Sequence, residues 1–494
     1  MARVGQGLSL YEVSSRAWMY ELGVTSLDDV PDAELDKLQE QKMHMIWLQG
    51  AFKLGSVGLA LDREEKSRME GYKKALPDFT PDDIIGSPYA IVEYVVSDEL
   101  GGNAAMARFR ERCAKRGLKL MLDFVPNHMA VDCAWADDPA CRDFFIRKPD
   151  NPADCNPDEF LPDGRAHGKD PYTGAWPDTA QLNYFNPALR EAQVDNLLRV
   201  ASICDVMRLD MAMLLLNKVH EQTWGRELRA TGWSAPPTEF WEDAIKRVRA
   251  KYPDTIFMAE VYWGLDTELV GLGFDLTYDK YLYDHLASGH MDNLRGYMSS
   301  RSLDFLRHSA HFVENHDEPR AVSEFCGPMR ANAAAAISFL LPGCRLIFHD
   351  QWHACSARLD VHLRRRSEYE SDAGTLRYYT VLNKVLAEPA FTEPDAGYHW
   401  TWPEPPDESD YDTWRLVAWR MTHEDDRFLV VVNYTDAAAC ARFKLPDAPS
   451  ASPAGEYTVH EYMAGKDYPR DAGELREHGL HCVMKPWGVQ IFKY

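Results

Sequence analysis

The sequence lacks the features that mark an exported or membrane-spanning protein. Residues 1–8 contain no long apolar core of the kind that a secretory signal carries, and no later apolar run reaches the length of a membrane span. The ten cysteines include no Cys-x-x-Cys pair, which favours reduced core thiols over a disulfide framework or a zinc site. Cys133, Cys141 and Cys155 cluster loosely and would pair only in an exported chain. We therefore expect a cytoplasmic protein.

The sequence is also poor in positive charge. Its 54 lysines and arginines are outnumbered by 77 aspartates and glutamates, which gives a formal net charge of −23. This balance, without a local basic patch, argues against nucleic acid or an anionic membrane as partner and favours a neutral or cationic ligand. At 494 residues, of which 45% are hydrophobic, the chain has enough apolar side chains for large cores. Its oligomeric state does not follow from composition.

Short strand-like runs alternate with helical patterns over about the first 390 residues. The predicted strands begin near residues 9, 45, 118, 206, 255, 273, 311 and 345. Eight β/α units predict an α/β fold, a closed (β/α)8 TIM barrel, in which chemistry lies at the carboxyl ends of the strands. The first strand is predicted over residues 8–18 and the fourth over 205–212, with an irregular segment from about 50 to 87.

Two regions depart from this alternation. Residues 129–187 are loop-rich and dense in Asp, Pro, Gly and Trp, and a structureless connection of that length is improbable, so we predict an inserted domain B after the third strand. Beyond about residue 393 short alternating runs replace the helices, which predicts a C-terminal antiparallel β-sandwich over 393–494. The catalytic barrel is then assigned to residues 1–128 and 188–392.

The apolar run Val206–Leu214 contains two charged residues, Arg208 and Asp210. In a strand, residues two apart leave from the same face, so the guanidinium and the carboxylate are expected to lie side by side. Burying such a pair costs several kcal/mol unless partners or function offset it. A structural ion pair and a catalytic pair explain these two residues about equally well.

Polar residues follow the apolar part of four predicted strands, the third, fourth, fifth and seventh. They lie in Asp123–His128, in Arg208–Asp210, at Glu260, and in Asn315–Asp317. A barrel would gather them on one rim, where three carboxylates are hard to explain as structural acids alone. Paired carboxylates without a metal motif or a phosphate-binding loop are suited to cleaving a glycosidic bond.

These four segments, in this order, resemble the signature regions of glycoside hydrolase family 13, the α-amylase family. The resemblance covers nearly the whole chain, and Thr179–Asn183 is similar to the family's domain B signature. Carried over by position, it implies Asp210 as nucleophile, Glu260 as general acid/base and Asp317 as the third acid that binds sugar hydroxyls. The residues that it implies in substrate binding are Tyr89, His128, Arg208, His316 and Arg320.

Departures from the family pattern bear on the substrate. Typical α-amylases carry Lys-His where this chain has Met213 and Leu214, and oligosaccharide-specific members often have Asp at the position of Gly86. The sequence from His316 to Arg320 is similar to the α-glucosidase branch. The resemblance therefore implies an enzyme for α-glucosides or short α-glucans.

We predict no metal site and no required cofactor, with calcium left open. Asn127 matches a family calcium ligand, whereas Gln181 stands where calcium-binding members have Asp, and a neutral amide is a poorer ligand for a hard cation. A group after the eighth strand, His349, Asp350, His353 and Cys355, is better explained by loop structure than by a metal. Some aromatic residues near the strand ends are candidates for stacking on sugar rings: Trp176, Tyr262, Trp263 and Trp352.

The leading hypothesis is a retaining glycosidase with a carbohydrate substrate, in which Asp210 forms a glycosyl enzyme and Glu260 moves the proton, with their carboxyls about 5 to 5.5 Å apart. A transglycosylase or sugar isomerase would use the same residues with water excluded. A non-catalytic glucan-binding protein is the alternative of another class. It is disfavoured because such a protein would be expected to have lost at least one of the three acids.

Overall fold

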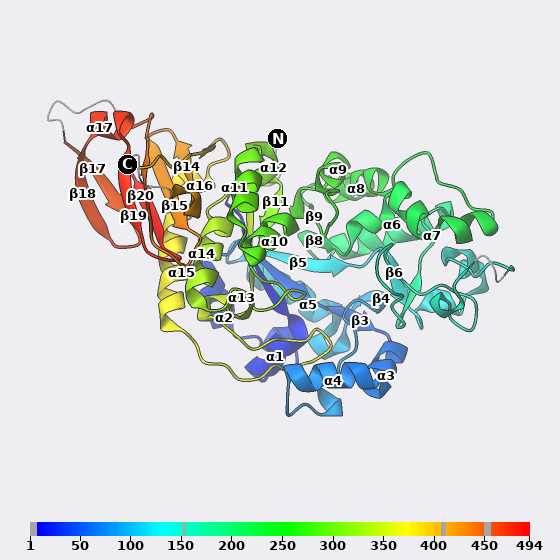
Figure 1. Ribbon diagram of the computed structural model, residues 1–494. Coiled ribbons are helices and arrows are strands. Elements are labelled where there is room, and N and C mark those ends of the chain that lie inside the picture. The colour runs from blue at the N-terminus through cyan, green and yellow to red at the C-terminus, as the bar shows by residue number, and fades with distance from the viewer. Residues whose placement is uncertain (1–6, 152–154, 407–411, 449–455) are drawn as a thin grey trace. The chain divides into compact units, whose positions relative to one another are not determined.

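The computed structural model describes residues 7–151, 155–406, 412–448 and 456–494. Its central sheet is a closed barrel of eight strands, as the sequence predicts, ordered β1, β12, β11, β10, β9, β8, β5, β2 (Figure 1). These strands are β1 (Ser9–Ser14), β2 (Met45–Gln49), β5 (Lys119–Phe124), β8 (Val206–Leu209), β9 (Ile256–Ala259), β10 (Leu276–Tyr278), β11 (Ser309–His311) and β12 (Cys344–Phe348). The paired registers are parallel, and strands such as β2 and β8 are buried along their whole length. Burial on both faces explains their apolar sequences.

The chain divides into two compact units. Of the described residues, the first contains Tyr11–Tyr278 and Ala357–Glu368, and the second contains residues 7–10, Asp279–Ser356 and Tyr369–Tyr494. This division does not test the boundaries predicted for the inserted domain and the C-terminal domain, which stay predictions. Residues 1–6, on which part of the expectation about a secretory signal rests, lie outside the described residues.

Helices follow most strands of the first unit, as a β/α alternation requires. They are α1 (Ser15–Leu22), α2 (Asp32–Glu40), α3 (Ser56–Glu64), α4 (Lys66–Ala75), α5 (Gly102–Ala114), α6 (Pro187–Ala201), α7 (Asn217–Ala230), α8 (Phe240–Lys251) and α9 (Asp266–Gly271). Local sequence sets their starts. Asn186, for example, caps α6 by accepting a hydrogen bond from the Ala188 amide, and Pro187 occupies the first turn.

Two short antiparallel pairs complete the first unit. β3 (Phe52–Leu54) pairs with β4 (Ile91–Val96), and β6 (His128–Ala130) pairs with β7 (Thr179–Gln181). In the segment predicted as an inserted domain, β6 lies at the start and β7 lies near the end. His128 lies opposite Gln181 in its register.

The strand predicted over residues 8–18 is wrong in extent. It ends at Ser14, helix α1 follows directly, and Gly23 ends that helix in a left-handed conformation with φ 67°. Trp18 favours strands by itself, yet it packs edge-on against Phe109 of α5, with ring centroids 6.2 Å apart. Packing between the two helices outweighs this local preference.

Two further predictions for this unit are wrong. The segment over 50–87, predicted as irregular, contains β3, α3 and α4; helix α4 is mostly polar and contains Gly71, which weakens its helical signal. The strand predicted over 205–212 ends at Leu209, and the next residues turn through Met211, whose φ is 43°. Asp210 therefore lies just beyond the strand.

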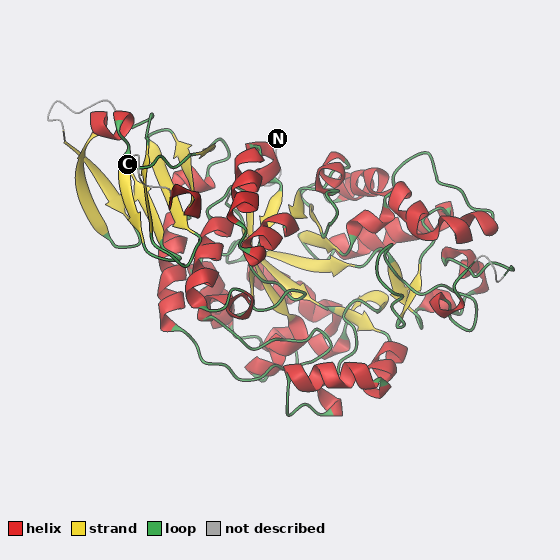
Figure 2. Ribbon diagram, in the orientation of Figure 1, coloured by secondary structure: helices red, strands yellow, loops and turns green. Residues whose placement is uncertain are grey.

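The second unit contains barrel strands β11 and β12, helices, and an antiparallel sheet domain (Figure 2). The helices are α10 (Lys280–Ser288), α11 (Met291–Ser300), α12 (Leu303–Arg307), α13 (Ala321–Glu324), α14 (Pro328–Phe339), α15 (Ala373–Val385), α16 (Pro389–Thr392) and α17 (Ala472–Glu477). The later strands are β13 (Gly397–Trp400), β14 (Leu416–His423), β15 (Asp426–Asn433), β16 (Ala439–Phe443), β17 (Glu456–Glu461), β18 (Lys466–Asp471), β19 (Leu480–Met484) and β20 (Val489–Lys493). The predicted C-terminal antiparallel domain is confirmed.

Two sheets make up that domain. Six strands form the order β13, β14, β15, β20, β17, β18, and β16 pairs with β19. Side chains of both sheets share one buried cluster, which includes Leu429, Val431, Phe443 and Cys482. Alternate residues of β14, β15, β16 and β19 belong to this cluster, as in a two-layer β structure.

No helix of the described residues is long and apolar enough to cross a membrane. Eight cysteines are buried as free thiols, whereas Cys326 is exposed and Cys440 is half-buried.

Candidate active site

Three neighbouring strands of the first unit carry the predicted site residues at their carboxyl ends. Asp123 of β5 lies opposite Arg208 of β8, and the backbone pairing continues past the strand ends. The Asp210 amide donates to the Phe124 carbonyl at 2.9 Å, and the Glu260 amide donates to the Leu209 carbonyl at 3.0 Å. The two acids are therefore fixed by main-chain hydrogen bonds on adjacent strands, as predicted for the rim of a parallel barrel.

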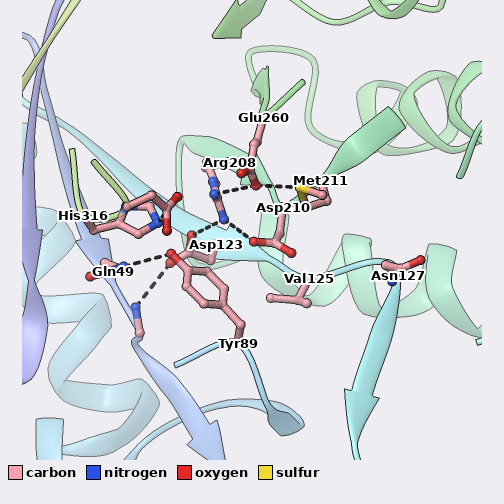
Figure 3. Close-up of polar contacts among 12 residues, drawn as sticks. Gln49, Tyr89, Asp123, Val125, Asn127, Arg208, Asp210, Met211, Glu260 and His316 are labelled. Atoms are coloured by element: carbon pink, nitrogen blue, oxygen red, sulfur yellow. Dashed lines mark hydrogen bonds and ion pairs between the residues drawn. The ribbon is translucent and has the colours of Figure 1, made fainter. Parts of the chain in front are cut away.

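Arg208 lies between the two predicted catalytic acids, as Figure 3 shows. Its Nη1 donates to Asp210 Oδ1 at 2.6 Å and its Nη2 donates to Glu260 Oε2 at 2.6 Å. The residue is 0% exposed. Although burial by itself lowers the pKa of Arg208, Glu260 and the other nearby groups raise it well above its usual value. Because charge-assisted hydrogen bonds are strong and directional, the guanidinium fixes the two carboxyl groups relative to each other.

Aromatic rings surround this guanidinium. Its central carbon lies 5.2 Å from the ring of Trp47, 5.3 Å from Tyr89 and 5.8 Å from Tyr278. Arg208 Nε also donates to the Tyr278 hydroxyl at 3.3 Å. The rings exclude water while their faces attract the cation, so they partly offset the cost of burying it.

Glu260 accepts two more hydrogen bonds. The Met211 amide donates to Oε2 at 2.8 Å, and the Tyr262 hydroxyl donates to Oε1 at 2.7 Å. The left-handed backbone at Met211 accompanies the first of these bonds just after the strand. Sequence reasoning considered Tyr262 only for stacking on sugars, and its spacing of two from Glu260 was the available signal for a hydrogen bond.

Asp123 and Tyr89 are held by residues that sequence reasoning missed. Asp123 Oδ2 accepts hydrogen bonds from Trp47 Nε1 and from the Gly50 amide, both at 3.2 Å. Its Oδ1 lies 3.5 Å from Arg208 Nη1. Gln49 Nε2 donates to the Tyr89 hydroxyl at 2.8 Å (Figure 3). Residues at and just after the end of β2 thus hold Asp123 and Tyr89 in position.

His128 is almost fully buried, and desolvation lowers its pKa to about 4. It is therefore neutral near pH 7 and is suited to hydrogen bonding rather than to supplying charge. The Trp176 ring lies edge-on to it, with centroids 5.2 Å apart.

The second unit carries the other predicted site residues. His316 Nε2 lies 3.0 Å from Asp317 Oδ2, and the Asp317 side chain is 45% exposed. Asn315 Oδ1 accepts the Asp317 amide at 3.0 Å, which fixes the turn. Arg320 is buried, with Nη1 donating to Glu314 Oε1 at 2.8 Å and to the His349 carbonyl at 2.8 Å.

The group after the eighth strand is bound into its own loop. His353 Nδ1 lies 3.0 Å from Ser371 Oγ, and the Tyr369 hydroxyl donates to Asp350 Oδ2 at 2.9 Å. Cys355 is fully buried. These contacts are typical of loop structure.

The two candidate calcium ligands hold each other instead. Gln181 Nε2 donates to Asn127 Oδ1 and to the Asn127 carbonyl, both at 2.9 Å, and Asn127 Nδ2 donates to Gln181 Oε1 at 3.2 Å. Both residues are buried. Calcium prefers several oxygen ligands with carboxylate charge, whereas these oxygens already accept hydrogen bonds from amide N–H groups. The pair does not fit a calcium site.

We predict that replacing Arg208 with methionine lowers kcat/KM by roughly 100-fold or more. The guanidinium fixes the positions of the two carboxyl groups, so its loss should lower kcat more than it raises KM. The free energy of unfolding should fall by about 3–5 kcal/mol, because two buried carboxyls lose this ion pair. Steady-state kinetics and urea unfolding measure these effects.

Arg249→Met is the matched control, because Arg249 Nη2 pairs with the nearly buried Asp275 at 2.6 Å away from these acids. It should lower stability and leave kcat and KM close to those of the wild type. An unchanged kcat in the Arg208→Met variant would show that Arg208 does not position the two acids.

Comparison with known proteins places this geometry in a family. The family model described as alpha amylase, catalytic domain, matches residues 34–356. The chain is 23% identical over 443 residues to alpha-amylase MalA of Haloarcula japonica, a match covering 86% of this chain and 55% of that relative. It is 24% identical over 307 residues to an alpha-glucosidase of Culex pipiens, covering 52% and 51%. The chain thus spans about half the length of these curated relatives.

Solved structures share the fold. An alpha-amylase from Lactobacillus plantarum superposes with a TM-score of 0.68 at 20% identity, with 99% of each chain covered. The maltogenic alpha-amylase AmyB from Thermotoga neapolitana gives 0.69 at 17% identity, covering 99% of this chain and 98% of its own. The catalytic-domain model matches more than half of the chain, from within α2 to just beyond β12, and the chain therefore belongs to the α-amylase family.

Proposed function

We propose that the chain is a retaining α-glycoside hydrolase acting on α-glucosides or short α-glucans. The observation that carries the proposal is the single buried guanidinium of Arg208 bound at 2.6 Å to both Asp210 and Glu260. Two carboxyl groups held on adjacent strand ends are the groups that double displacement needs, one as the nucleophile and the other as the general acid and base. Asp317 is proposed as the third acid from its sequence motif.

The proposed reaction has two steps. In the first, Asp210 attacks the anomeric carbon while Glu260, after taking up a proton, gives that proton to the departing glycosidic oxygen. In the second, Glu260 accepts a proton from water, whose oxygen displaces Asp210 and restores the α configuration. The Tyr262 hydroxyl and the Met211 amide would hold Glu260 in position throughout.

Short substrates are favoured by the residues after Asp210. Met213 and Leu214 are 0% and 2% exposed, so neither side chain is available to hold a sugar where typical α-amylases have Lys-His. Relatives named as alpha-glucosidases, from Culex pipiens and Candida albicans, are in agreement with this substrate class. Transglycosylation uses the same acids, and the two reactions differ in whether water or a sugar receives the glycosyl group.

The defining experiment is proton NMR of the protein with maltose, longer maltooligosaccharides, sucrose and trehalose. We expect release of the α-anomer with free glucose, as retention requires. New glycosidic linkages without net hydrolysis would replace the proposal with a transferase or isomerase. Unchanged anomeric signals for every sugar would favour a non-catalytic glucan-binding protein.

We predict distinct defects for Asp210→Asn and Glu260→Gln. Each should lower activity on maltooligosaccharides by roughly 100-fold or more, because a nucleophile or a general acid is lost. With an α-glucosyl fluoride, whose leaving group needs no proton, Glu260→Gln should accumulate a glycosyl enzyme because its second step lacks a general base. Intact-protein mass spectrometry would detect the added glycosyl group.

Asp195→Asn and Glu242→Gln are matched controls on exposed helix positions and should behave as the wild type. A glycosyl adduct in the Asp210→Asn variant, or near-normal turnover in either site variant, would contradict the assigned roles.

Trp263 is proposed to contact the leaving-group side of the substrate. It follows Glu260 by three residues in a left-handed turn with φ 63°, and it remains 37% exposed. Its ring meets that of Tyr172, which is 67% exposed, with centroids 4.9 Å apart. Two exposed aromatic rings in contact form a surface on which a sugar ring can stack.

We predict that Trp263→Ala raises KM for maltotriose about 5- to 12-fold, since stacking on one aromatic ring contributes about 1–1.5 kcal/mol. Steady-state kinetics on maltotriose and on an α-glucosyl fluoride would separate the two sides of the bond, because the fluoride has no leaving-group sugar. Trp414→Ala, which removes a tryptophan of the second unit that is 44% exposed, is the control. Equal effects on both substrates would count against this placement.

We propose that the enzyme requires no calcium, on the evidence of the Asn127–Gln181 amide pair. Dialysis against EDTA should leave both kcat/KM and Tm unchanged, because the amides satisfy each other without an ion. Differential scanning calorimetry and an activity assay before and after dialysis measure this. A loss restored by added calcium, but not by magnesium, would overturn it.

A further inference from the structure

The first unit contains a cavity of about 370 Å³ that the catalytic contacts leave unused. Its walls come from α1, the turn that follows α1, the turn after β4, and the 357–368 segment. The lining residues are Arg16, Met19, Tyr20, Val24, Thr25, Glu99, Leu100 and Arg364. This volume is large enough for a small organic molecule.

Two guanidinium groups line this cavity, and only one of them is neutralised. The Arg16 side chain is 8% exposed, and its Nε donates to Glu99 Oε2 at 2.7 Å. Its other nitrogens donate to the Gly50 carbonyl and, at 3.4 Å, to the Phe52 carbonyl. Arg16 is therefore compensated by one carboxylate and two carbonyls.

Arg364 has no such compensation within the described part of the chain. Its backbone amide donates to the Asp83 carbonyl at 2.9 Å, but its guanidinium makes no hydrogen bond or ion pair with a described residue, and its Nε is buried. The two arginines also repel each other: burial lowers the pKa of Arg16, and Arg364 lowers it further. The cavity thus carries one excess positive charge in a chain of net charge −23.

A half-buried cation without a protein partner is unfavourable unless an anion or water meets it. A guanidinium presents a planar fork of N–H donors that matches carboxylate and phosphate oxygens. The remaining walls are largely apolar, with Met19 and Leu100 buried and Val24 half-buried, so they are suited to the carbon part of a ligand. Glu99 is exposed on the side chain at 58%, which leaves it free to turn away from an incoming anion.

We propose that this cavity binds a small organic oxyanion, a carboxylate or a phosphate monoester. Arg364 supplies the primary charge, Arg16 a second set of donors, and Met19 and Leu100 the apolar contact. The site contains neither Asp210 nor Glu260, so the proposal is independent of the glycosidase reaction. A neutral sugar would leave the excess charge of Arg364 unmatched.

The test is isothermal titration of the full-length protein with inorganic phosphate, phenyl phosphate and benzoate at constant ionic strength. Phenyl phosphate should bind more tightly than inorganic phosphate, because its ring contacts the apolar wall. The stronger of phenyl phosphate and benzoate identifies the oxyanion type. Absence of binding by all three probes at millimolar concentration would overturn the proposal.

Arg364→Gln should weaken binding of the preferred probe at least tenfold. Arg358→Gln, which removes an exposed positive charge from the same segment, should bind as the wild type. Thr25→Trp offers a second route, because a bulky side chain at an exposed lining position fills the cavity without changing charge. Unchanged binding in both Arg364→Gln and Thr25→Trp, or an equal loss in Arg358→Gln, would refute the site.

Discussion

The arrangement of the first unit's site depends on one buried guanidinium. Arg208 binds the carboxyl groups of both Asp210 and Glu260, and it has no exposure to water. Isolated buried charges would each cost several kcal/mol, so the three are stable only together. The surrounding aromatic rings and the main-chain bonds of adjacent strands hold them in register. The same interaction that makes burial tolerable also fixes the spacing of the two acids, which links stability to the proposed chemistry.

The barrel could be predicted from the sequence because its parallel strands are buried on both faces and read as short apolar runs. Each of the eight predicted starting points has a strand of the barrel in the structure. Boundaries were less predictable. Helix α1 contains strand-prone Trp18, and its helical state depends on packing against α5, a contact that no local pattern contains. Helix α4 is mostly polar, so its helical period is weak.

The sequence singles out Arg208, Asp210 and Glu260, because charges at the end of an apolar strand are costly to bury. The structure brings the three together in one hydrogen-bonded group, and their roles in catalysis stay predictions. The supporting residues could not be found in this way. Trp47 and Gln49 alternate in a buried strand like ordinary core residues, and their hydrogen bonds to Asp123 and Tyr89 arise only when β2 lies beside β5. The mutual amide bonds of Asn127 and Gln181 likewise join residues more than fifty positions apart. The residues next to Asn127 and Gln181 in the sequence do not indicate that these two side chains hydrogen-bond to each other.

Gly50 connects the candidate active site of the first unit with the cavity proposed to bind an oxyanion, the oxyanion cavity lined by Arg16 and Arg364. Its amide donates to Asp123 next to Arg208, and its carbonyl accepts from Arg16 at the oxyanion cavity. Its φ is 71°, and a side chain there would bring a carbon within 2.9 Å of the Pro88 ring. A change in the backbone conformation of Gly50, or its substitution, would therefore disturb both sites together. Any sequence change that reshapes the oxyanion cavity through this turn would also displace the support beneath the acids, so the two regions are constrained to vary as one.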